Sequence, residues 1–380
     1  MNFLHFIFGR AWGVSPPQDL KSPDGAAAKN LHNLPTELII SIAESISINS
    51  ASCLALCNRH LSQILGPKIW TSLQHQDHSS RMEFLTLLAA GLPQYFACHS
   101  CVRLHRSSAV RWPRSVFSYQ QDLFCFENVR GHHYQWPPSL YLIKFPHIQS
   151  AMKRHRYGPE HGFPLEVFSY SEVEDEGAHL TTLFTYEARI VNDELLMRSQ
   201  QWLLVPSDRR ESLYTQRLLH HLCEHISWAH PSRRNNNLSL PGLVKSTLDL
   251  LQARQPCSTG TQQCSQCYMD YVIDAVDFDE KGVALLVTRW INLGAGFTPE
   301  DPKWRNHMKW PRDRGAVYQP QLTGSIRLSF EDQEGQSLRD VTQENISKLF
   351  SKRKTQPLTR GYDGFVWEWN SWTPSYWYLR

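Results

Sequence analysis

The sequence predicts an α+β protein in which a small helical unit precedes a larger domain with a mainly antiparallel sheet. Three observations support this fold class. Apolar side chains recur at helical spacing through residues 31–73. Several later segments are rich in β-branched and aromatic residues, which is typical of strands. No run of alternating strand and helix patterns occurs, so a parallel sheet is not expected.

Length, composition and charge define the broad class of protein. The chain has 380 residues, of which 41% are hydrophobic, enough for a packed core. Its net charge of +3 is too mild for a nucleic-acid-binding surface. No apolar run approaches the roughly 18 residues that cross a bilayer, and the start MNFLHFIFGRAWG lacks the basic segment of a secretory signal. The expected location is the cytoplasm or nucleus, where the nine cysteines stay mostly reduced.

The chain divides into three expected parts. Residues 1–30 predict a disordered leader, because the stretch 13–30 is dominated by Pro, Gly, Ala, Ser and charge. Residues 31–73 form the helical unit, and residues 80–380 form the α+β C-terminal domain. The expected strands of that domain cover residues 180–190, 282–293, 325–330 and 364–369. Its expected helices lie at residues 80–92, near 214–228 and at 241–253.

The helical unit carries more apolar surface than a small bundle needs. Its first helix begins at Pro35, which a helix tolerates in the first turn. A second helix is expected from Ser50 and should end at Gly66 and Pro67. About forty residues bury little surface on their own, so extra apolar faces must meet the rest of the chain or a partner protein. The side chains that recur every four residues along the first helix are Leu34, Leu38, Ile42 and Ile46.

This unit resembles a known family. The segment NLPTELIISIAESISINSASCLALCNRHLSQILGPKIW is similar to the F-box, with Leu-Pro-x-Glu-aliphatic at its start, an aliphatic helix, Cys-x-Arg in the second helix and a closing Trp. It departs from the pattern at residues 48–53, where Asn, Ser and Ala replace the Leu and Asp of many members. The resemblance implies three helices that dock on the Skp-type adaptor of a cullin–RING ubiquitin ligase. The residues that it assigns to the adaptor surface or the box core are Leu34, Pro35, Leu38, Ile42, Leu54, Leu61 and Trp70.

The rest of the chain resembles the same family more weakly. The segments LAAGLPQYFACHSCVRLH and CSQCYMDYVIDA are similar to parts of a large group of filamentous-fungal F-box proteins with an uncharacterised C-terminal domain. The resemblance implies a non-catalytic subunit of an SCF-type ligase, with a Skp-type adaptor and a cullin scaffold as partners and a protein substrate held by the C-terminal domain. The alternative is a structural or binding protein outside any ligase, whose box packs on its own chain.

Two Cys-x-x-Cys pairs predict a structural zinc site. The sequence ACHSC supplies Cys98 and Cys101, and QCSQC supplies Cys264 and Cys267. Each pair presents two thiolates to one ion, and two pairs complete a tetrahedral zinc site. The expectation is one ion that joins two distant segments and contributes directly to folding free energy.

Other interpretations of these cysteines remain open. His105 lies four residues after Cys101 and Cys257 lies seven before Cys264, so either is an alternative ligand. Without a metal, the cysteines would be buried and inert thiols. The Gly that often follows the cysteines of a zinc knuckle is absent, and Val102 and Tyr268 stand in its place.

Enzyme signatures are weak. His221, Glu224 and His225 match the His-x-x-Glu-His pattern of inverted zinc peptidases, which would need both histidines on one side of a helix. They flank an apolar stripe, so histidines at the edge of a packed helix are the simpler interpretation. The carboxylates of YVIDAVDF alternate with apolar residues and predict the polar face of a strand. The chain is therefore expected not to be an enzyme.

Overall fold

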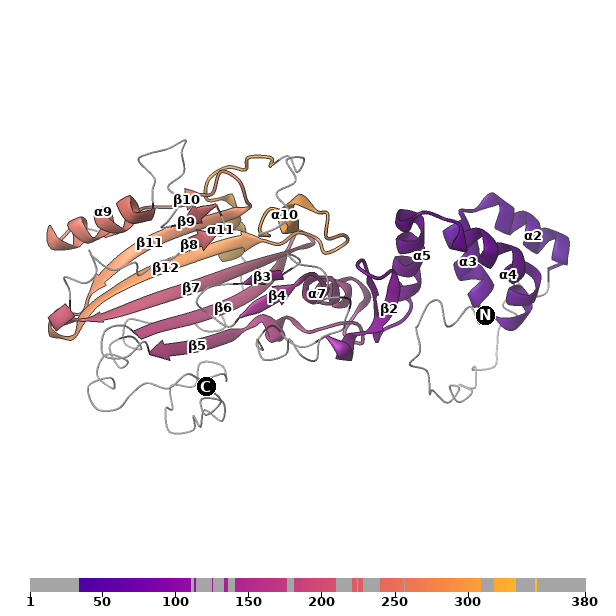
Figure 1. The fold of residues 1–380 in the computed structure, drawn as a ribbon, viewed down its shortest axis with the longest axis horizontal. Coiled ribbons are helices and arrows are strands. Elements are labelled where there is room, and N and C mark those ends of the chain that lie inside the picture. Colours follow the sequence, from indigo (N-terminus) through magenta and orange to yellow (C-terminus); the bar gives the residue numbers. More distant parts are fainter. Residues whose placement is uncertain are drawn as a thin grey trace.

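Helices form the N-terminal part of the chain and a six-stranded antiparallel sheet dominates the part that follows, which confirms the α+β class (Figure 1). The computed structural model describes residues 34–110, 113, 125, 133–135, 141–175, 181–209, 221–223, 225–227, 240–255, 257–308, 318–332 and 346. In Figure 1 the first helices lie beyond one end of the sheet, and α5, β2 and α7 lie between them and the sheet.

Three helices form the N-terminal bundle: α2 (Thr36–Ser45), α3 (Ile48–Leu56) and α4 (Arg59–Gln74). The Ser47 hydroxyl accepts the N–H of Ser50, and the Asn58 side chain accepts the N–H of Leu61, so α3 and α4 each have their own N-cap. The single helix expected from Ser50 is therefore two. The expected break at Pro67 is wrong, because Pro67 lies inside α4 and the last turns of that helix carry apolar side chains into two cores.

Helix α5 (His78–Ala90) joins this bundle to the rest of the chain and confirms the helix expected at 80–92. It packs on α3. The rings of Trp70 and Phe84 lie 6.5 Å apart, and the Asn49 amide donates to Glu83 at 2.7 Å. The Asn49 amide therefore ties α3 to α5.

A hairpin of β1 (Tyr95–Cys98) and β2 (Arg103–Arg106) follows α5 and faces two cores. Phe96 and Cys98 belong to the large core of the sheet domain, whereas Ala97 and Leu104 belong to the smaller core under α5. Successive strand residues point to opposite faces, so one short hairpin contributes to both cores. It couples the N-terminal helices to the sheet domain.

The central sheet has the strand order β10–β11–β12–β7–β6–β5, with every neighbouring pair antiparallel. Asn192 and Asp193, with φ of 51° and 59°, form the tight turn between β6 and β7, where such left-handed residues suit the twist of the strands. The strand bounds are β5 (Tyr170–Asp175), β6 (Thr181–Val191), β7 (Glu194–Pro206), β10 (Gln262–Gln263), β11 (Met269–Asp277) and β12 (Gly282–Asn292).

Helices pack on both faces of the sheet. The large core includes side chains of α7 (Phe145–Tyr157), α9 (Leu240–Gln252) and Trp304 of α10 (Pro302–Arg305). A second core lies under α11 (Ser325–Glu331), where Phe330 and Ile326 meet Trp290. Two small hairpins add β3 (His133–Gln135) with β4 (Leu142–Lys144), and β8 (His221–Cys223) with β9 (Ile226–Ser227). Short 3₁₀ turns lie at Ser107–Ala109, Leu165–Phe168, Ser207–Arg209 and Asp279–Lys281.

The structure corrects two expected elements. The strand expected at 325–330 is helix α11, whose first N–H groups donate to the buried carboxylate of Asp270 at distances of 2.9–3.2 Å. Of the helix expected near 214–228, the described residues form hairpin β8–β9 instead. The helix expected at 241–253 and the strands expected at 180–190 and 282–293 are confirmed. The strand expected at 364–369 lies outside the described residues.

Candidate metal centres and an exposed apolar stripe

The two predicted Cys-x-x-Cys pairs lie in two separate groups rather than in one site. The first centre consists of Cys98, Cys101, His105 and Cys125. The second centre consists of Cys223, His225, Cys264 and Cys267. In each centre the four ligand atoms lie within 4.8 Å of one another. The expected single site shared by both pairs is therefore corrected: each pair has its own two partners.

The β1–β2 hairpin builds the first centre. Cys98 ends β1, and its carbonyl accepts the N–H of Val102 at 2.9 Å, which closes the turn around Cys101. Val102 has a φ of 54°, a left-handed conformation that costs a residue other than Gly about 1–2 kcal/mol. The turn thus has the backbone shape that Gly usually provides after a zinc-knuckle cysteine, although a β-branched residue occupies the position.

Short contacts join the ligand atoms of the first centre. The sulfurs of Cys98 and Cys125 lie 3.8 Å apart, and His105 Nε2 lies 3.5 Å from the sulfur of Cys125 and 3.0 Å from that of Cys101. Hydrogen bonding by the neighbouring Cys101 and Cys125 thiols lowers the pKa of Cys98. Burial lowers the pKa of His105, but hydrogen bonds to Cys101 and Cys98 outweigh burial and raise it to about 9. Hydrogen bonding by Cys101 and Cys98 raises the pKa of the Cys125 thiol, so the thiolate of this centre lies on Cys98 rather than on Cys125.

Two hairpins build the second centre. Cys223 lies in β8 and His225 in the turn after it, while Cys264 and Cys267 lie between β10 and β11. The N–H of Cys264 donates to Met269 O at 3.0 Å, which closes the turn that carries the pair. The sulfurs of Cys223 and Cys264 lie 3.7 Å apart, and the sulfur of Cys223 lies 3.8 Å from His225 Nδ1.

The second centre is the more buried of the two. Cys223, Cys264 and Cys267 are all buried, and His225 is half-buried. Burial raises the pKa of the Cys223 and Cys267 thiols, while hydrogen bonds from those two thiols lower the pKa of Cys264. Three sulfurs beside one imidazole are a ligand set for a metal ion, and both centres have it, although only Cys98 is buried among the sulfurs of the first. Either centre could hold one ion.

Sequence reasoning missed half of these ligands. It named His105 only as an alternative ligand, and it did not name Cys125 or Cys223. The other alternative, Cys257, lies outside both centres and its sulfur donates to Gln255 O at 2.8 Å. All nine cysteines are free thiols. The count of cysteines and histidines was the one available signal. Beyond the two Cys-x-x-Cys pairs the chain has five more cysteines and many histidines that could complete separate sites.

The peptidase pattern does not lie on a helix. Its first histidine belongs to strand β8 and His225 to the turn after it, so the two histidines do not share a helix face. His225 belongs to the second centre with three cysteines. Glu224 lies outside the described residues, so its position relative to the centre is not described.

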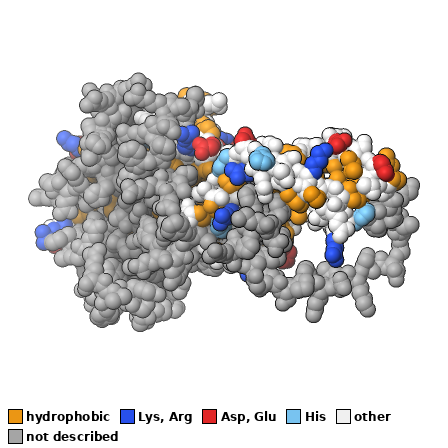
Figure 2. Space-filling model, turned by 45° about the vertical axis from the view of Figure 1, so that its right-hand side comes forward, with side chains coloured by type: hydrophobic (Ala, Val, Ile, Leu, Met, Phe, Trp, Pro, Cys, Tyr) orange, Lys and Arg blue, Asp and Glu red, His pale blue; other side chains and the backbone are white. Residues whose placement is uncertain are grey.

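Helix α2 exposes the apolar stripe that the sequence predicts. Ile39 is the buried residue of α2 and points into the bundle core. The side chains of the stripe lie on the exposed surface of the helix. Five of the ten exposed large hydrophobic side chains in the described part of the chain lie between residues 34 and 46. Figure 2 shows hydrophobic side chains on the surface of the N-terminal helices, at the right of the view. The exposed fractions are 36% for Leu34, 51% for Leu38, 39% for Ile40, 37% for Ile42 and 39% for Ile46.

The other residues that the F-box resemblance singled out are less exposed, except Pro35. Pro35 lies beside the stripe and is exposed. Leu54 and Trp70 are half-buried, and both pack against the small core of the bundle. Leu61 is fully buried in that core, so it supports the bundle and cannot meet a partner.

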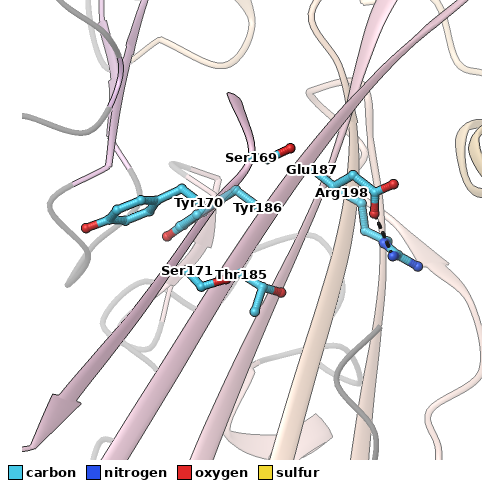
Figure 3. Close-up of a pocket in the computed structure, with 7 residues that line it drawn as sticks. All are labelled: Ser169, Tyr170, Ser171, Thr185, Tyr186, Glu187 and Arg198. Atoms are coloured by element: carbon cyan, nitrogen blue, oxygen red, sulfur yellow. Dashed lines mark hydrogen bonds and ion pairs between the residues drawn. The ribbon is translucent and has the colours of Figure 1, made fainter. Parts of the chain in front are cut away.

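A cavity of about 20 Å³ lies beside strands β5, β6 and β7 (Figure 3). In Figure 3 the rings of Tyr170 and Tyr186 lie on one side of these strands, and the Glu187–Arg198 ion pair lies on the other. Glu187 and Arg198 are cross-strand partners whose charged atoms lie 2.7 Å apart. The space suits one or two water molecules, so the cavity is too small for a substrate.

Comparisons with known proteins give no relative from which function could be inferred. No family model, no curated protein and no solved structure matches the chain. Within the described residues no helix is long and apolar enough to cross a bilayer. The site residues themselves must therefore carry the functional argument.

Proposed function

We propose that this chain is a substrate-recruiting F-box adaptor of an SCF-type cullin–RING ubiquitin ligase. The observation that carries the proposal is the exposed aliphatic stripe that runs along α2 and the residues flanking it, formed by Leu34, Leu38, Ile42 and Ile46. It lies on a three-helix bundle whose sequence begins with the Leu-Pro-x-Glu-aliphatic pattern of the F-box. The stripe would be the contact surface for the Skp-type adaptor.

The energetics of the stripe favour a partner. Burying a Leu or Ile side chain contributes about 1.5–3 kcal/mol, and a contiguous exposed apolar patch marks an interaction site. The opposite side of the bundle is already used, because Trp70 packs on Phe84 and Asn49 bonds Glu83. One face of the bundle therefore packs on the rest of the chain. The stripe on the other face stays exposed among the described residues. That arrangement favours an adaptor over a box packed wholly on its own chain.

The sheet domain would hold the protein substrate. Its role would be to keep the substrate near the ubiquitin-charged enzyme, so that this chain accelerates transfer by proximity and not by chemistry of its own. The β1–β2 hairpin supports this role, because it packs into both the α5 core and the sheet core and so couples the docking end to the sheet domain.

Zinc is the metal that we propose for both centres. With Zn–S near 2.3 Å and Zn–N near 2.0–2.1 Å, tetrahedral geometry places two sulfurs about 3.8 Å apart and a sulfur and a nitrogen about 3.6 Å apart. The sulfur pairs lie at 3.8 and 3.7 Å, and His105 and Cys125 at 3.5 Å. Disulfide sulfurs would lie near 2.05 Å. These three distances match the spacing of a zinc site, whereas the Cys101 sulfur and His105 Nε2, at 3.0 Å, stand closer than bound zinc would place them.

These ions would be structural. Each centre offers three cysteines and one histidine, which is a complete tetrahedral set with no open position for water or substrate. In the first centre zinc would pin the hairpin that joins the two cores. In the second it would hold hairpin β8–β9 against the turn between edge strand β10 and its neighbour β11. A peptidase would need an open position, so this ligand set disfavours that alternative.

Assembly on a ligase scaffold tests the proposal. The full chain is immobilised and incubated with a purified cullin, with and without the Skp-type adaptor. We expect the cullin to be retained only when the adaptor is present, and to be lost with the Leu34→Ala/Pro35→Ala chain, because both residues are exposed beside α2. Retention of cullin without adaptor, or none from a folded sample, would contradict the ligase assignment.

A further inference from the structure

A pocket of about 50 Å³ lies where helix α5 and hairpin β1–β2 meet the sheet domain. Helix α5 and strand β1 form one side, and helix α7 and the loop after β12 form the other. Small residues such as Ala89 and Gly296 line part of its wall. Two cationic side chains, Lys153 and Arg156, also line it.

Lys153 is a buried ammonium without a carboxylate partner among the described residues. The residue is 6% exposed, and its Nζ donates to the carbonyls of Leu92 at 2.6 Å and Tyr95 at 2.7 Å. An ammonium has three N–H groups, so one remains for a ligand. Burial lowers the pKa of Lys153 to about 8, and no neighbouring carboxylate raises it again. An anion in the pocket would balance this charge.

Arg156 shapes the rim of the pocket. Its guanidinium donates to the carboxylate of Asp193 at 3.1 Å and to Ala295 O at 2.7 Å, so its charge is already balanced. It also stacks 3.7 Å from the ring centroid of Phe297. Phe297 is 55% exposed and Tyr157 on the same pocket is 49% exposed. Tyr, Phe and Arg side chains are enriched at protein–protein interfaces.

We propose that this pocket binds the carboxylate side chain of an aspartate in an acidic, aromatic-flanked peptide segment of a partner protein. Lys153 Nζ would donate its third hydrogen to the carboxylate, and the neighbouring peptide side chains would pack on Tyr157 and Phe297. A water-sized group needs about 10–15 Å³ of such space, so the pocket of about 50 Å³ admits a group of about three to five heavy atoms, and an aspartate side chain, with four, fits within that range. Within the proposed function, on which this reading rests, the segment belongs to the substrate.

Peptide binding tests the inference without any ligase component. The probe is a dye-labelled, amidated Gly-Phe-Asp-Phe-Gly, and its matched control replaces Asp by the isosteric Asn. Binding to the zinc-loaded full chain is followed by fluorescence anisotropy. We expect the Asp peptide to bind and the Asn peptide to bind at least about tenfold more weakly, because charge-assisted hydrogen bonds are the stronger ones.

Variants separate the pocket from general charge. Lys153→Met should weaken the Asp peptide at least about tenfold, and Phe297→Ala, at an exposed position that leaves the core intact, should also weaken it. Lys245→Met removes an exposed lysine of α9 outside the pocket and should leave affinity unchanged. Thermal melts establish that each variant is folded.

Three outcomes would overturn the inference. Neither peptide binds the wild-type chain, both peptides bind equally, or a folded Lys153→Met chain binds as tightly as the wild type. Displacement of the Asp peptide by inorganic phosphate at concentrations where acetate has no effect would assign the pocket to phosphate instead. Cullin retention is measured without peptide, so failure of this inference and failure of the ligase assignment are distinguishable.

Discussion

Cys264→Ser is expected to release one of two zinc ions and to lower the melting temperature by about 5 °C. Structural zinc contributes folding free energy directly, and loss of several kcal/mol is a large share of the 5–15 kcal/mol that stabilises most proteins. The sulfur of Cys264 is buried among the other ligands of the second centre, so serine would leave a buried and incomplete ligand set. The measurements are the zinc content per chain and a calorimetric melt.

Cys257→Ser is the matched control for this substitution. Cys257 lies seven residues before Cys264 and belongs to neither centre. It should keep two zinc ions per chain and a melting temperature close to that of the wild type, because its sulfur only donates to Gln255 O. One zinc per wild-type chain, or equal losses from the two substitutions, would contradict two separate centres. Either result would favour a single ion shared by the two Cys-x-x-Cys pairs.

Leu38→Asp/Ile42→Asp is expected to weaken adaptor binding by about a hundredfold or more while leaving the chain folded. Both side chains lie on the exposed stripe, so the bundle core does not need them. Buried anchors at a protein interface contribute about 2 kcal/mol or more each, and every 1.4 kcal/mol is tenfold in affinity. Affinity is measured by calorimetric titration of the variant with the Skp-type adaptor.

Leu87→Asp is the control that tests whether adaptor binding depends on the stripe or on exposed apolar side chains elsewhere. Leu87 is 45% exposed on α5, outside the three-helix bundle, so the same kind of substitution there should leave adaptor affinity unchanged. If the stripe variant and the Leu87 variant bind the adaptor alike, α2 does not carry the interface. The alternative of a box outside any ligase would then account better for the stripe.

That the N-terminal segment is helical was predictable because helical signals are local, although the division into α3 and α4 and the passage of α4 through Pro67 were missed. A proline in the first turn, apolar side chains at helical spacing and capping residues all act within a few positions. The same periodicity could not tell which side of α2 is buried, because the helix is apolar on more than one side. Burial at Ile39 depends on the packing of α3 and α4, which no single helix encodes.

The complete ligand sets of the metal centres could not be predicted from the sequence. Each Cys-x-x-Cys pair was visible because its spacing is local, but its partners come from distant or structurally unforeseen positions. The second centre joins the separate hairpin β8–β9 to the turn between β10 and β11, so spacing alone could not pair Cys223 with Cys264. Helix α11 was missed for a similar reason. The carboxylate of Asp270 accepts hydrogen bonds from the first N–H groups of α11. Even the first of these residues, Gly324, lies 54 positions after Asp270 in the sequence.

Native mass spectrometry of the chain co-purified with the Skp-type adaptor tests the account most directly. The predicted result is a single species whose mass equals one chain, one adaptor and two zinc ions, one for each centre. Acidification should remove the zinc, because thiolate and imidazole ligands are then protonated. A folded chain that carries no adaptor would contradict the proposed function, and a complex with no zinc would contradict the proposed metal centres.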